Sequence, residues 1–394
     1  NQVEQELGVA ERGPVGAAKP LQNQVIGVCQ PPQAARADQF GVDSAHPRRK
    51  RRVGRDSKRS GLAVHRAAGA HHEVGGRNQA DEYYGYRKQH NFRDLEVILQ
   101  GPIVGHLAVL YDLYWNDPWT IPIEHLVDVS EELTPEELAR WLKGRDGVVK
   151  IPDSATTEQW RELFDLGYTG TVRLIVDTPP DQNPAVDSPI HLAEAFIKLI
   201  DATESELLLV SAYFIPTEDL TAAIERATTR GVKVRVLTNS LGSNNHVTAH
   251  AAYAKHRPKL LAAGAELYEL RADASARALY VFNAVEEDVL GLHAKIALFD
   301  DCCLMVGSAN LDPRSLRLNT EIGALIESPG LNSHVRELFA IDLLPENAWR
   351  VKMNTRGNIV WEGPEGDVHN APPASFFMRA ESWFFGLLPI EDQM

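Results

Sequence analysis

The chain has 394 residues, 44% of them hydrophobic, which is enough for two domains of ordinary size with their own cores. Its net charge of -14 argues against a nucleic-acid partner, because sequence-independent binding to DNA or RNA depends on clustered Lys and Arg. No apolar run is long enough to cross a bilayer, and three cysteines are too few for a disulfide framework, so we expect a reducing compartment. Nothing in the sequence implies a cofactor or a metal.

Residues 1–73 differ in composition from the rest of the chain. They contain one aromatic residue, Phe40, among many Ala, Gly, Arg, Gln and Pro. Such a segment buries too little apolar area to offset the entropy lost on ordering, so we expect it to stay outside the fold. Two alternatives remain open. Its basic run, residues 48–59, is a patch that binds nucleic acid or anionic lipid, or the segment comes from a different reading frame than the sequence that starts at Val74.

From Val74 onward, short apolar runs typical of strands alternate with segments of helical period. The strand-like runs are Leu95–Gln100, Val172–Val176, Glu206–Phe214, Val232–Thr238, Glu266–Leu270, Ala294–Phe299, Cys303–Val306 and Ile322–Ile326. The helical segments are Ile103–Trp115, Ile190–Ile200, Thr217–Thr229, His250–Ala263 and Ser333–Leu343. This alternation predicts an α/β fold in which helices flank a mixed sheet on both faces.

Two parts of the sequence repeat each other. Gly75-Gly76-Arg77-Asn78 resembles Gly307-Ser308-Ala309-Asn310, and the run from Asp94 to Pro102 resembles the run from Glu321 to Pro329. Both runs end at a proline that precedes a helical segment. We therefore expect two similar halves, residues 74–180 and 190–345, joined by a linker at Pro180–Pro189. A hairpin around residues 351–361 and an apolar tail then occupy residues 346–394.

The segment from Leu292 to Asn310 combines residues suited to phosphodiester chemistry without a metal. Side chains alternate along a strand, so His293 and Lys295 are expected on one face, and Ser308 and Asn310 likewise share a face. A histidine that attacks phosphorus forms a phosphohistidine, and Lys295 and Asn310 can stabilise the phosphoryl charge. Glu321 can hold the ring and fix its tautomer. Each residue alone is more often structural, whereas the whole set at this spacing favours catalysis.

These residues resemble the signature of the phospholipase D superfamily, His-x-Lys-x4-Asp-x6-Gly-Ser-x-Asn. The matching positions are His293, Lys295, Asp300, Gly307, Ser308 and Asn310. Four further segments resemble bacterial cardiolipin synthases of this superfamily: Asp81-Glu82-Tyr83-Tyr84-Gly85, Phe92-Arg93-Asp94-Leu95, Asn310-Leu311-Asp312-Pro313-Arg314-Ser315 and Leu318-Asn319-Thr320-Glu321. The resemblance implies two α/β/α halves packed as a pseudo-dimer, with one histidine from each half at their interface.

The resemblance also assigns roles to individual residues. It implies that His293, Lys295 and Glu321 are catalytic, and that Lys295, Ser308, Asn310 and Asn78 bind the substrate phosphate. It implies structural roles for Asp300 and Gly307 in the second half. It implies structural roles for Gly75, Gly76 and Asp94 in the first half as well.

The first half departs from the signature at its most important positions. Counted back from Gly75, the histidine, lysine and aspartate of a first motif are expected at positions occupied by Gly61, Ala63 and Ala68. The chain therefore supplies one catalytic histidine where the mechanism uses two. A homodimer in which each chain contributes one histidine is one alternative, and loss of activity is another.

The resemblance implies a phosphatidyltransferase of cardiolipin-synthase type, which moves a phosphatidyl group from phosphatidylglycerol or a related lipid through His293 to an alcohol. Two alternatives stay open: a phospholipase or phosphodiesterase that hydrolyses the same bond, and a catalytically dead remnant that binds a lipid headgroup or a partner. A phospholipid substrate and a peripheral position on the cytoplasmic face of the bacterial membrane are expected. The apolar tail Ser382–Pro389 either enters the membrane interface or packs on the core.

Overall fold

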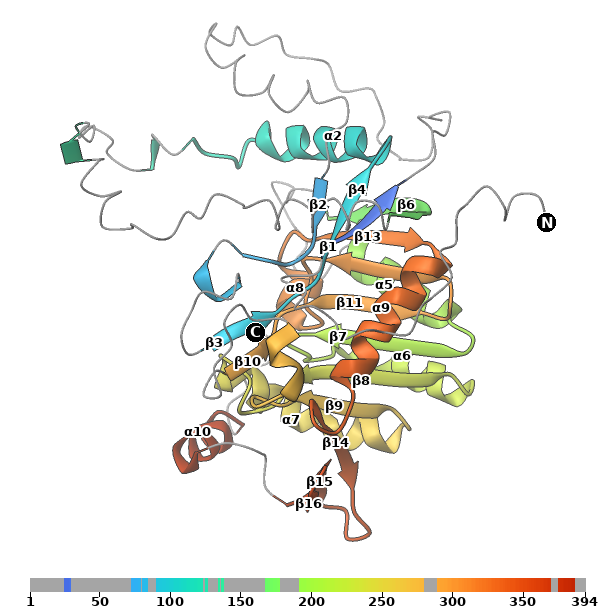
Figure 1. Ribbon diagram of the computed structural model, residues 1–394, viewed down its shortest axis with the longest axis vertical. Coiled ribbons are helices and arrows are strands. Elements are labelled where there is room, and N and C mark those ends of the chain that lie inside the picture. The colour runs from blue at the N-terminus through green and yellow to red at the C-terminus, as the bar shows by residue number, and fades with distance from the viewer. Residues whose placement is uncertain are drawn as a thin grey trace, which may run out of the picture.

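The computed structural model shows a mixed α/β protein built on one large sheet with helices on both faces (Figure 1). It describes residues 25–29, 72–78, 80–83, 90–122, 125–126, 134, 136–137, 167–177, 191–279, 289–369 and 375–386. Gly61, Ala63, Ala68 and the expected linker at Pro180–Pro189 lie outside these ranges. Within the described ranges, no helix is long and apolar enough to span a bilayer.

The large sheet has ten strands in the order β16-β15-β14-β9-β8-β7-β11-β12-β13-β6. Its centre is parallel and consists of β7 (Glu206–Ser211), β8 (Lys233–Asn239) and β9 (Glu266–Leu270). The flanking strands pair antiparallel and are β6 (Thr171–Val176), β11 (Lys295–Phe299), β12 (Cys303–Gly307), β13 (Ile322–Glu327), β14 (Ala348–Met353), β15 (Ile359–Gly363) and β16 (Gly366–Val368). Leu207 to Val210 are all buried because helices cover both faces of β7.

Two apolar cores lie on the two faces of the large sheet. One contains side chains from α5 (His191–Ala202), α6 (Glu218–Thr229) and α7 (Val247–Ala262), and the other contains side chains from α9 (Pro329–Asp342). Helix α6 begins where the Thr217 side chain accepts a hydrogen bond from the Leu220 N–H, followed by two acidic residues that suit a helix N-terminus. The apolar faces of the helices pack them on the sheet.

A second sheet packs against the α9 core. It has the order β2-β4-β1-β5 and consists of β1 (Val25–Cys29), β2 (His72–Val74), β4 (Glu96–Gln100) and β5 (Tyr168–Thr169). Helix α2 (Ile103–Trp115) follows β4 and buries Ile103 in the same core. Strand β1 and the start of β2 belong to residues 1–73, which differs from the expectation that this segment stays outside the fold. The remainder of that segment lies outside the described residues.

The repeat in the sequence corresponds to a repeat in the structure. Strand β2 pairs antiparallel with β4, which leads into α2, and β12 pairs antiparallel with β13, which leads into α9. In each unit an acidic residue, Asp94 or Glu321, comes shortly before the second strand. The two units thus share an antiparallel strand pair followed by a helix.

Strands from the two repeat units meet in a separate two-stranded sheet. Strand β3 (His90–Arg93) pairs in parallel with β10 (Val289–Leu292). Arg93 then reaches across to Asp342 on α9, with 3.0 Å between Nε and Oδ2, and both side chains are at most 1% exposed. Its guanidinium also lies 4.3 Å from the centre of the Phe339 ring. A buried pair of this kind is costly to break from one side, because the remaining charge has no partner.

Most predicted elements are present, with shifted ends. Helix α2 and strand β9 have the predicted bounds, whereas α7 begins at Val247 and not at His250. The predicted hairpin around residues 351–361 is confirmed by the pairing of β14 with β15. Further elements lie outside the predicted segments: helices α8 (Pro313–Arg317) and α10 (Phe376–Gly386), and the short helical turns η2 (Asp81–Tyr83) and η4 (Ser275–Leu279).

The close packing of β12 on β13 predicts a strict requirement for glycine at position 307. A Cβ atom there would lie 2.2 Å from the Ile322 carbonyl oxygen and 2.9 Å from the Gly323 Cα, so Gly307→Ala forces the backbone to shift. We expect a loss of about 1–3 kcal/mol in the free energy of unfolding, measured by urea titration. Gly105→Ala in α2 is the matched control, since nothing lies within 4 Å of the added carbon. Equal stability of the two variants would contradict this packing.

Candidate active site

His293 lies between β10 and β11, with its ring held by a residue of the first repeat unit. Its N–H and that of Ala294 both donate to the Arg93 carbonyl, which continues the pairing of β10 with β3. This places the ring Nδ1 2.7 Å from Oδ2 of Asp94, the residue after β3. The second oxygen of Asp94 accepts the Leu95 N–H at 3.0 Å. The backbone therefore holds the carboxylate in the position in which it binds the ring.

The electrostatics favour a neutral ring beside a charged carboxylate. Burial lowers the pKa of His293 below its usual value, although the hydrogen bond to Asp94 works in the opposite direction. Burial alone would raise the pKa of Asp94, but the hydrogen bond from His293 and the positive charges of Lys295 and Arg77 bring it below its usual value. A neutral ring that donates from Nδ1 to Asp94 has its lone pair on Nε2. That nitrogen can act as a nucleophile once the Lys295 ammonium beside it turns to a bound phosphate.

Lys295 lies against the imidazole. Its Nζ is 3.2 Å from Nδ1 and 3.1 Å from Nε2 of His293, and it also donates to the carbonyl oxygen of the same residue. Burial lowers the pKa of Lys295 to about 8, although nearby carboxylates, Asp94 and Glu321 among them, oppose the shift. The ammonium group lies next to the position that a phosphoryl oxygen would take beside the nucleophile. A phosphate that enters the site gains a cation already placed beside the attacking nitrogen.

The predicted role of Glu321 differs from what the structure shows. Glu321 accepts hydrogen bonds from the Ser308 hydroxyl at 2.5 Å and from the Asn319 amide at 3.0 Å, while Asp94 holds the ring of His293. The Glu321 N–H donates to Asp177. Glu321 comes from the same repeat unit as the histidine, and its hydrogen bonds fix the Ser308 loop. The acid that orients the ring comes from the other unit.

The side chain of Asn310 has a buried acceptor. Its Oδ1 is inaccessible to solvent and accepts no hydrogen bond from the described residues. The loop around it is held firmly, since the Leu311 N–H donates to Ser211 Oγ at 3.0 Å and Asp312 caps α8 by accepting the Ser315 N–H. A buried amide oxygen without a donor is unfavourable. A hydroxyl group bound in the site would satisfy it.

The first repeat unit contributes the opposite wall. A Cβ atom on Gly76 would lie 2.6 Å from Cδ of Lys295, so glycine allows the two chain segments to approach. Asn78 is exposed, and its amide donates to the Tyr83 hydroxyl at 3.0 Å. The Tyr83 ring meets the His293 ring edge to face at 4.8 Å, and Phe92 lies 5.5 Å from the same ring. Asn78 therefore reaches the histidine only through Tyr83.

Gly75 and Asp300 stand outside the reacting groups. A Cβ on Gly75 would lie 2.5 Å from Cγ of Glu96, whose carboxylate forms a buried ion pair with Arg77. Burial raises the pKa of Glu96 to about 7, even though Arg77 opposes this. Asp300 has a left-handed backbone, with φ of 47°, and accepts hydrogen bonds from Ser205 Oγ and from the N–H groups of residues 204–206. It thus ties the turn after β11 to the start of β7.

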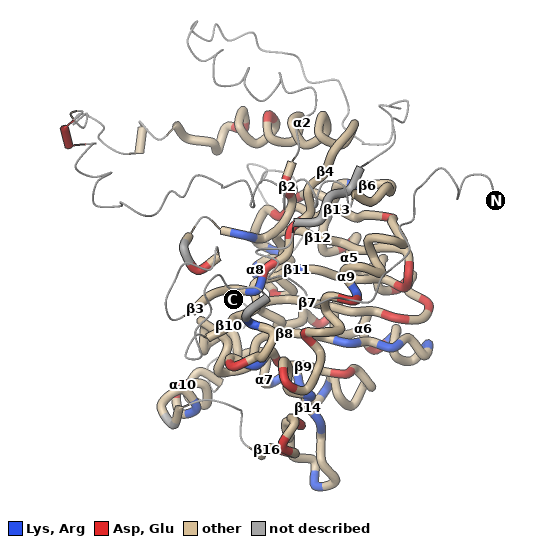
Figure 2. Tube along the Cα trace, viewed as in Figure 1, with Lys and Arg blue, Asp and Glu red and all other residues tan. Residues whose placement is uncertain are grey.

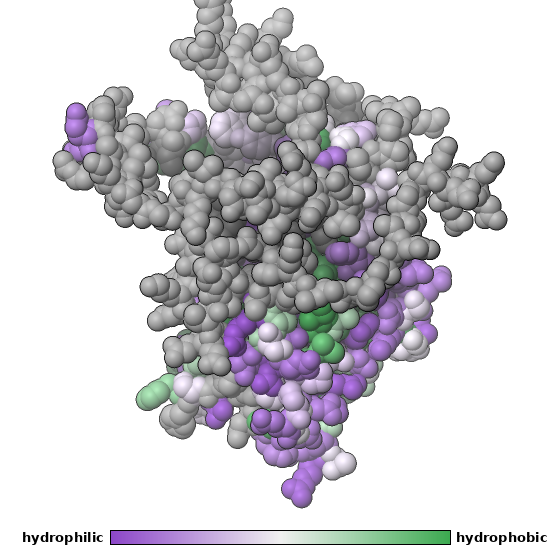
Figure 3. Space-filling model, in the orientation of Figure 1, coloured by the Kyte–Doolittle hydropathy of each residue, from purple (hydrophilic) through white to green (hydrophobic). Residues whose placement is uncertain are grey.

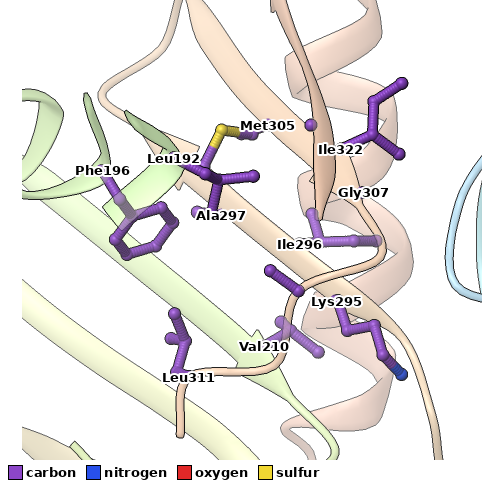
Figure 4. A pocket seen from close by; sticks show the side chains of 12 residues that line it. Leu192, Phe196, Val210, Lys295, Ile296, Ala297, Met305, Gly307, Leu311 and Ile322 are labelled. Carbon is purple, nitrogen blue, oxygen red and sulfur yellow. The ribbon is translucent and has the colours of Figure 1, made fainter. Parts of the chain in front are cut away.

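The stem of Lys295 borders a small apolar cavity. The cavity has a volume of about 20 Å³, and Phe196, Met305 and Leu311 are among the residues that line it. In Figure 4 the Nζ of Lys295 points away from these side chains. The cavity has room for about one water molecule. It is therefore a packing defect beside the lysine stem and is too small to bind a lipid. Within the described ranges, no group of His, Cys, Asp and Glu side chains is placed to hold a metal ion.

The sequence did not single out Tyr83, Phe92, Arg77 and Glu96 as site residues, nor Asp94 as the residue that holds the ring. Tyr83 and Phe92 stand in two of the segments that resemble the cardiolipin synthases, and Arg77 stands inside the repeated Gly75 to Asn78 motif. These positions were the available signal. Strand alternation within one half cannot show which residues of the other half approach the histidine.

Replacement of the ring-holding carboxylate tests the assignment of Asp94. Since Asp94 raises the pKa of His293, Asp94→Asn should lower that pKa further. Glu321→Gln is the control, because Glu321 bonds Ser308 and not the ring. Both titrations can be followed by imidazole NMR. A larger shift in the Glu321 variant than in the Asp94 variant would overturn the assignment.

Anion binding should depend on the protonation of Lys295. With a pKa of about 8, the side chain is charged below pH 8 and loses its charge as the pH rises further. We expect tungstate, which keeps its charge across this range, to bind roughly tenfold more weakly at pH 9 than at pH 7 by calorimetry. Lys295→Met should bind weakly at both pH values. Constant affinity for the unmodified chain across this range would contradict the prediction.

Comparisons with known proteins identify the family of the chain. Residues 196–343 match the family model described as "Cardiolipin synthase, PLD-like domain". The chain is 30% identical over 338 residues to cardiolipin synthase C of Escherichia coli, which covers 81% of this chain and 69% of that protein. It is 27% identical over 334 residues to an uncharacterized protein of Helicobacter pylori, of which it spans 64%. Cardiolipin synthase 2 of Staphylococcus epidermidis is 25% identical over 295 residues, 74% of this chain and 49% of that protein.

Solved structures resemble the chain more distantly. Phosphatidylserine synthase of Haemophilus influenzae has a TM-score of 0.33 and 17% identity, and the match covers 44% of this chain and 38% of that one. The phospholipase D family member Nuc of Salmonella typhimurium has a TM-score of 0.32 and 18% identity, with 45% of this chain and 96% of that one covered. On the strength of the matches in sequence, the chain belongs to the phospholipase D superfamily and carries a domain of the cardiolipin synthase type.

Proposed function

We propose that the chain is a phosphatidyltransferase of the cardiolipin-synthase type that acts through His293. The observation that carries the proposal is the buried imidazole of His293, whose Nδ1 is bound to the Asp94 carboxylate and which has the Lys295 ammonium 3.1 Å from Nε2. This leaves one nitrogen for attack on phosphorus and puts a cation next to the point where the phosphoryl oxygens would lie. Relatives named cardiolipin synthases support a phospholipid as the substrate.

The reaction would proceed in two displacements at phosphorus. Nε2 of His293 attacks the phosphate of phosphatidylglycerol, an N–P bond forms, and the P–O bond to the free glycerol breaks. The glycerol leaves as an alcohol after it takes up a proton. The hydroxyl of a second phosphatidylglycerol then attacks phosphorus and gives up its proton to solvent, the N–P bond breaks, and cardiolipin and the free histidine result. Lys295, Ser308 and Asn310 would bind the phosphoryl oxygens, with Asn78 and Tyr83 on the opposite wall.

The finer architecture belongs to the same proposal. Residues 74–180 and 190–345 would be two related halves packed as a pseudo-dimer, with the site at their junction. The repeated strand pair and helix in each half supports this arrangement. The lipid substrate supports a peripheral position on the cytoplasmic face of the membrane, where a phospholipid headgroup can enter from the bilayer.

Proton transfer to the leaving glycerol is the weak step. The superfamily uses its second histidine as general acid, but Gly61 stands at the corresponding position of this chain. Lack of a general acid slows the reaction roughly 10²- to 10⁴-fold. This favours a second candidate function, a lipid-binding remnant with little or no turnover. A partner chain in a homodimer is a further source of the missing group.

Conversion of phosphatidylglycerol in detergent micelles tests the proposal. The chain as given should form cardiolipin slowly, and His293→Ala should form none, since it removes the nucleophile. A triple variant, Gly61→His with Ala63→Lys and Ala68→Asp, rebuilds the first motif and should be faster by roughly 10²-fold or more. Thin-layer chromatography with mass spectrometry identifies the products.

Each result separates the candidates. Cardiolipin from the chain as given, absent in His293→Ala, supports the transferase. Phosphatidic acid with little cardiolipin would support the hydrolase instead. Product from the triple variant alone would identify the chain as an inactive remnant, and unchanged activity in His293→Ala would overturn the proposed mechanism.

A further inference from the structure

Helix α10 exposes an aromatic face to solvent. Trp383 is 69% exposed, Phe384 55% and Phe377 80%. Helical spacing puts Phe377, Phe384 and Ala380 close together on one side, next to Trp383. The half-buried residues Met378 and Ser382 lie on the other side of the helix. The helix therefore turns its aromatic side chains outward while its opposite side packs along α7.

The position of α10 links this face to the active site. Tyr213, which follows β7, donates a hydrogen bond from its hydroxyl to Asn245 and packs edge to face on His246, the residue before α7. The end of β7 at Ser211 is the register partner of Lys295. Helix α7 thus begins beside the site, and α10 packs on α7. Figure 1 shows α10 at the same edge of the large sheet as β3 and β10.

The chemistry of the face suits the interface of a bilayer. Tryptophan and phenylalanine partition into the boundary between headgroups and acyl chains, where an apolar ring is buried. Helix α10 carries one Arg and one Glu, so it has no net charge, and Figure 2 shows no cluster of basic residues along it. In Figure 3 hydrophobic atoms project from the lower left of the molecule, where Figure 1 places α10. The net charge of the chain, -14, does not favour electrostatic attraction to anionic lipid.

We propose that α10 is the element that docks the chain on a phospholipid bilayer, by inserting Trp383, Phe384 and Phe377 between the headgroups. Docking through this helix brings the edge of the sheet that holds His293 toward the membrane, so a headgroup can reach the site without the lipid leaving the bilayer. This inference rests on the proposed function, because a phospholipid substrate is what requires contact with a bilayer.

Sedimentation of the full chain with vesicles tests the docking directly. The vesicles contain phosphatidylethanolamine with phosphatidylglycerol, or phosphatidylcholine alone. We expect Trp383→Glu and Phe384→Glu each to lower the partition coefficient at least about tenfold on both vesicle types. Each variant removes one aromatic ring that would be buried in the bilayer. Trp383→Phe should bind almost as well as the unmodified chain. Raising the salt concentration to 1 M should leave binding nearly unchanged.

The opposite end of the molecule offers a matched control. Trp115 on α2 is 61% exposed and stands among other exposed apolar side chains, but α2 lies far from α10 in Figure 1. Trp115→Glu should leave vesicle binding intact. Equal binding by Trp383→Glu and the unmodified chain would overturn the inference. Equal loss in Trp115→Glu, or release of the chain by salt, would do the same.

A second readout separates this inference from the proposed function. Cardiolipin formation from short-chain phosphatidylglycerol below its micelle concentration needs the site but no bilayer. We expect Trp383→Glu to keep that activity and to lose activity on vesicles. Binding that depends on α10 without any cardiolipin from any variant would leave the docking in place and remove the proposed transferase. Activity that is equal on vesicles for Trp383→Glu and the unmodified chain would remove the docking and leave the transferase.

Discussion

The hydrogen bond between His293 and Asp94 is the contact on which the active site depends. It joins residues 199 positions apart in the chain and is shielded from solvent on both sides. Its geometry follows from backbone pairing, because the Arg93 carbonyl accepts the N–H groups of His293 and Ala294 where β3 and β10 end. The side chain of Arg93 then binds Asp342 of α9. One short segment, residues 93–94, therefore fixes the histidine by its main chain and its carboxylate. The same segment is anchored to α9.

Buried charges around this bond balance one another. Asp94 faces His293 and lies close to Lys295 and Arg77, while Arg77 is held by Glu96. Taking any of these groups out of water is unfavourable unless an opposite charge or a hydrogen bond compensates for the loss of hydration. The raised pKa of Glu96, about 7, and the lowered pKa of Lys295, about 8, are the consequence of incomplete compensation. The site thus holds both a carboxyl group and an amine that titrate near neutral pH.

The sequence predicted those parts of the fold and the site that depend on neighbours along the chain. Lys295 and His293 are close because one residue separates them, and strands such as β9 follow from uninterrupted apolar runs. Contacts between the halves were beyond reach of the same reasoning. Asp94 and Glu321 occupy equivalent places in the repeat, and nothing in either segment shows which of the two faces the histidine. The parallel pairing of β3 with β10 decides this, and such a pairing has no local pattern in the sequence.

The contribution of a carboxylate from the first repeat to the histidine of the second has a consequence for how such proteins evolve. If each repeat oriented its own histidine, a duplicated gene could lose one copy of the motif and keep the other intact. Here the histidine of the second repeat depends on an acid that belongs to the first. The first repeat can therefore lose its own histidine motif without harm to the second repeat only while selection preserves Asp94 and the strand before it. An intact signature in one repeat is thus no measure of an intact catalytic unit, since the unit is inherited from both copies.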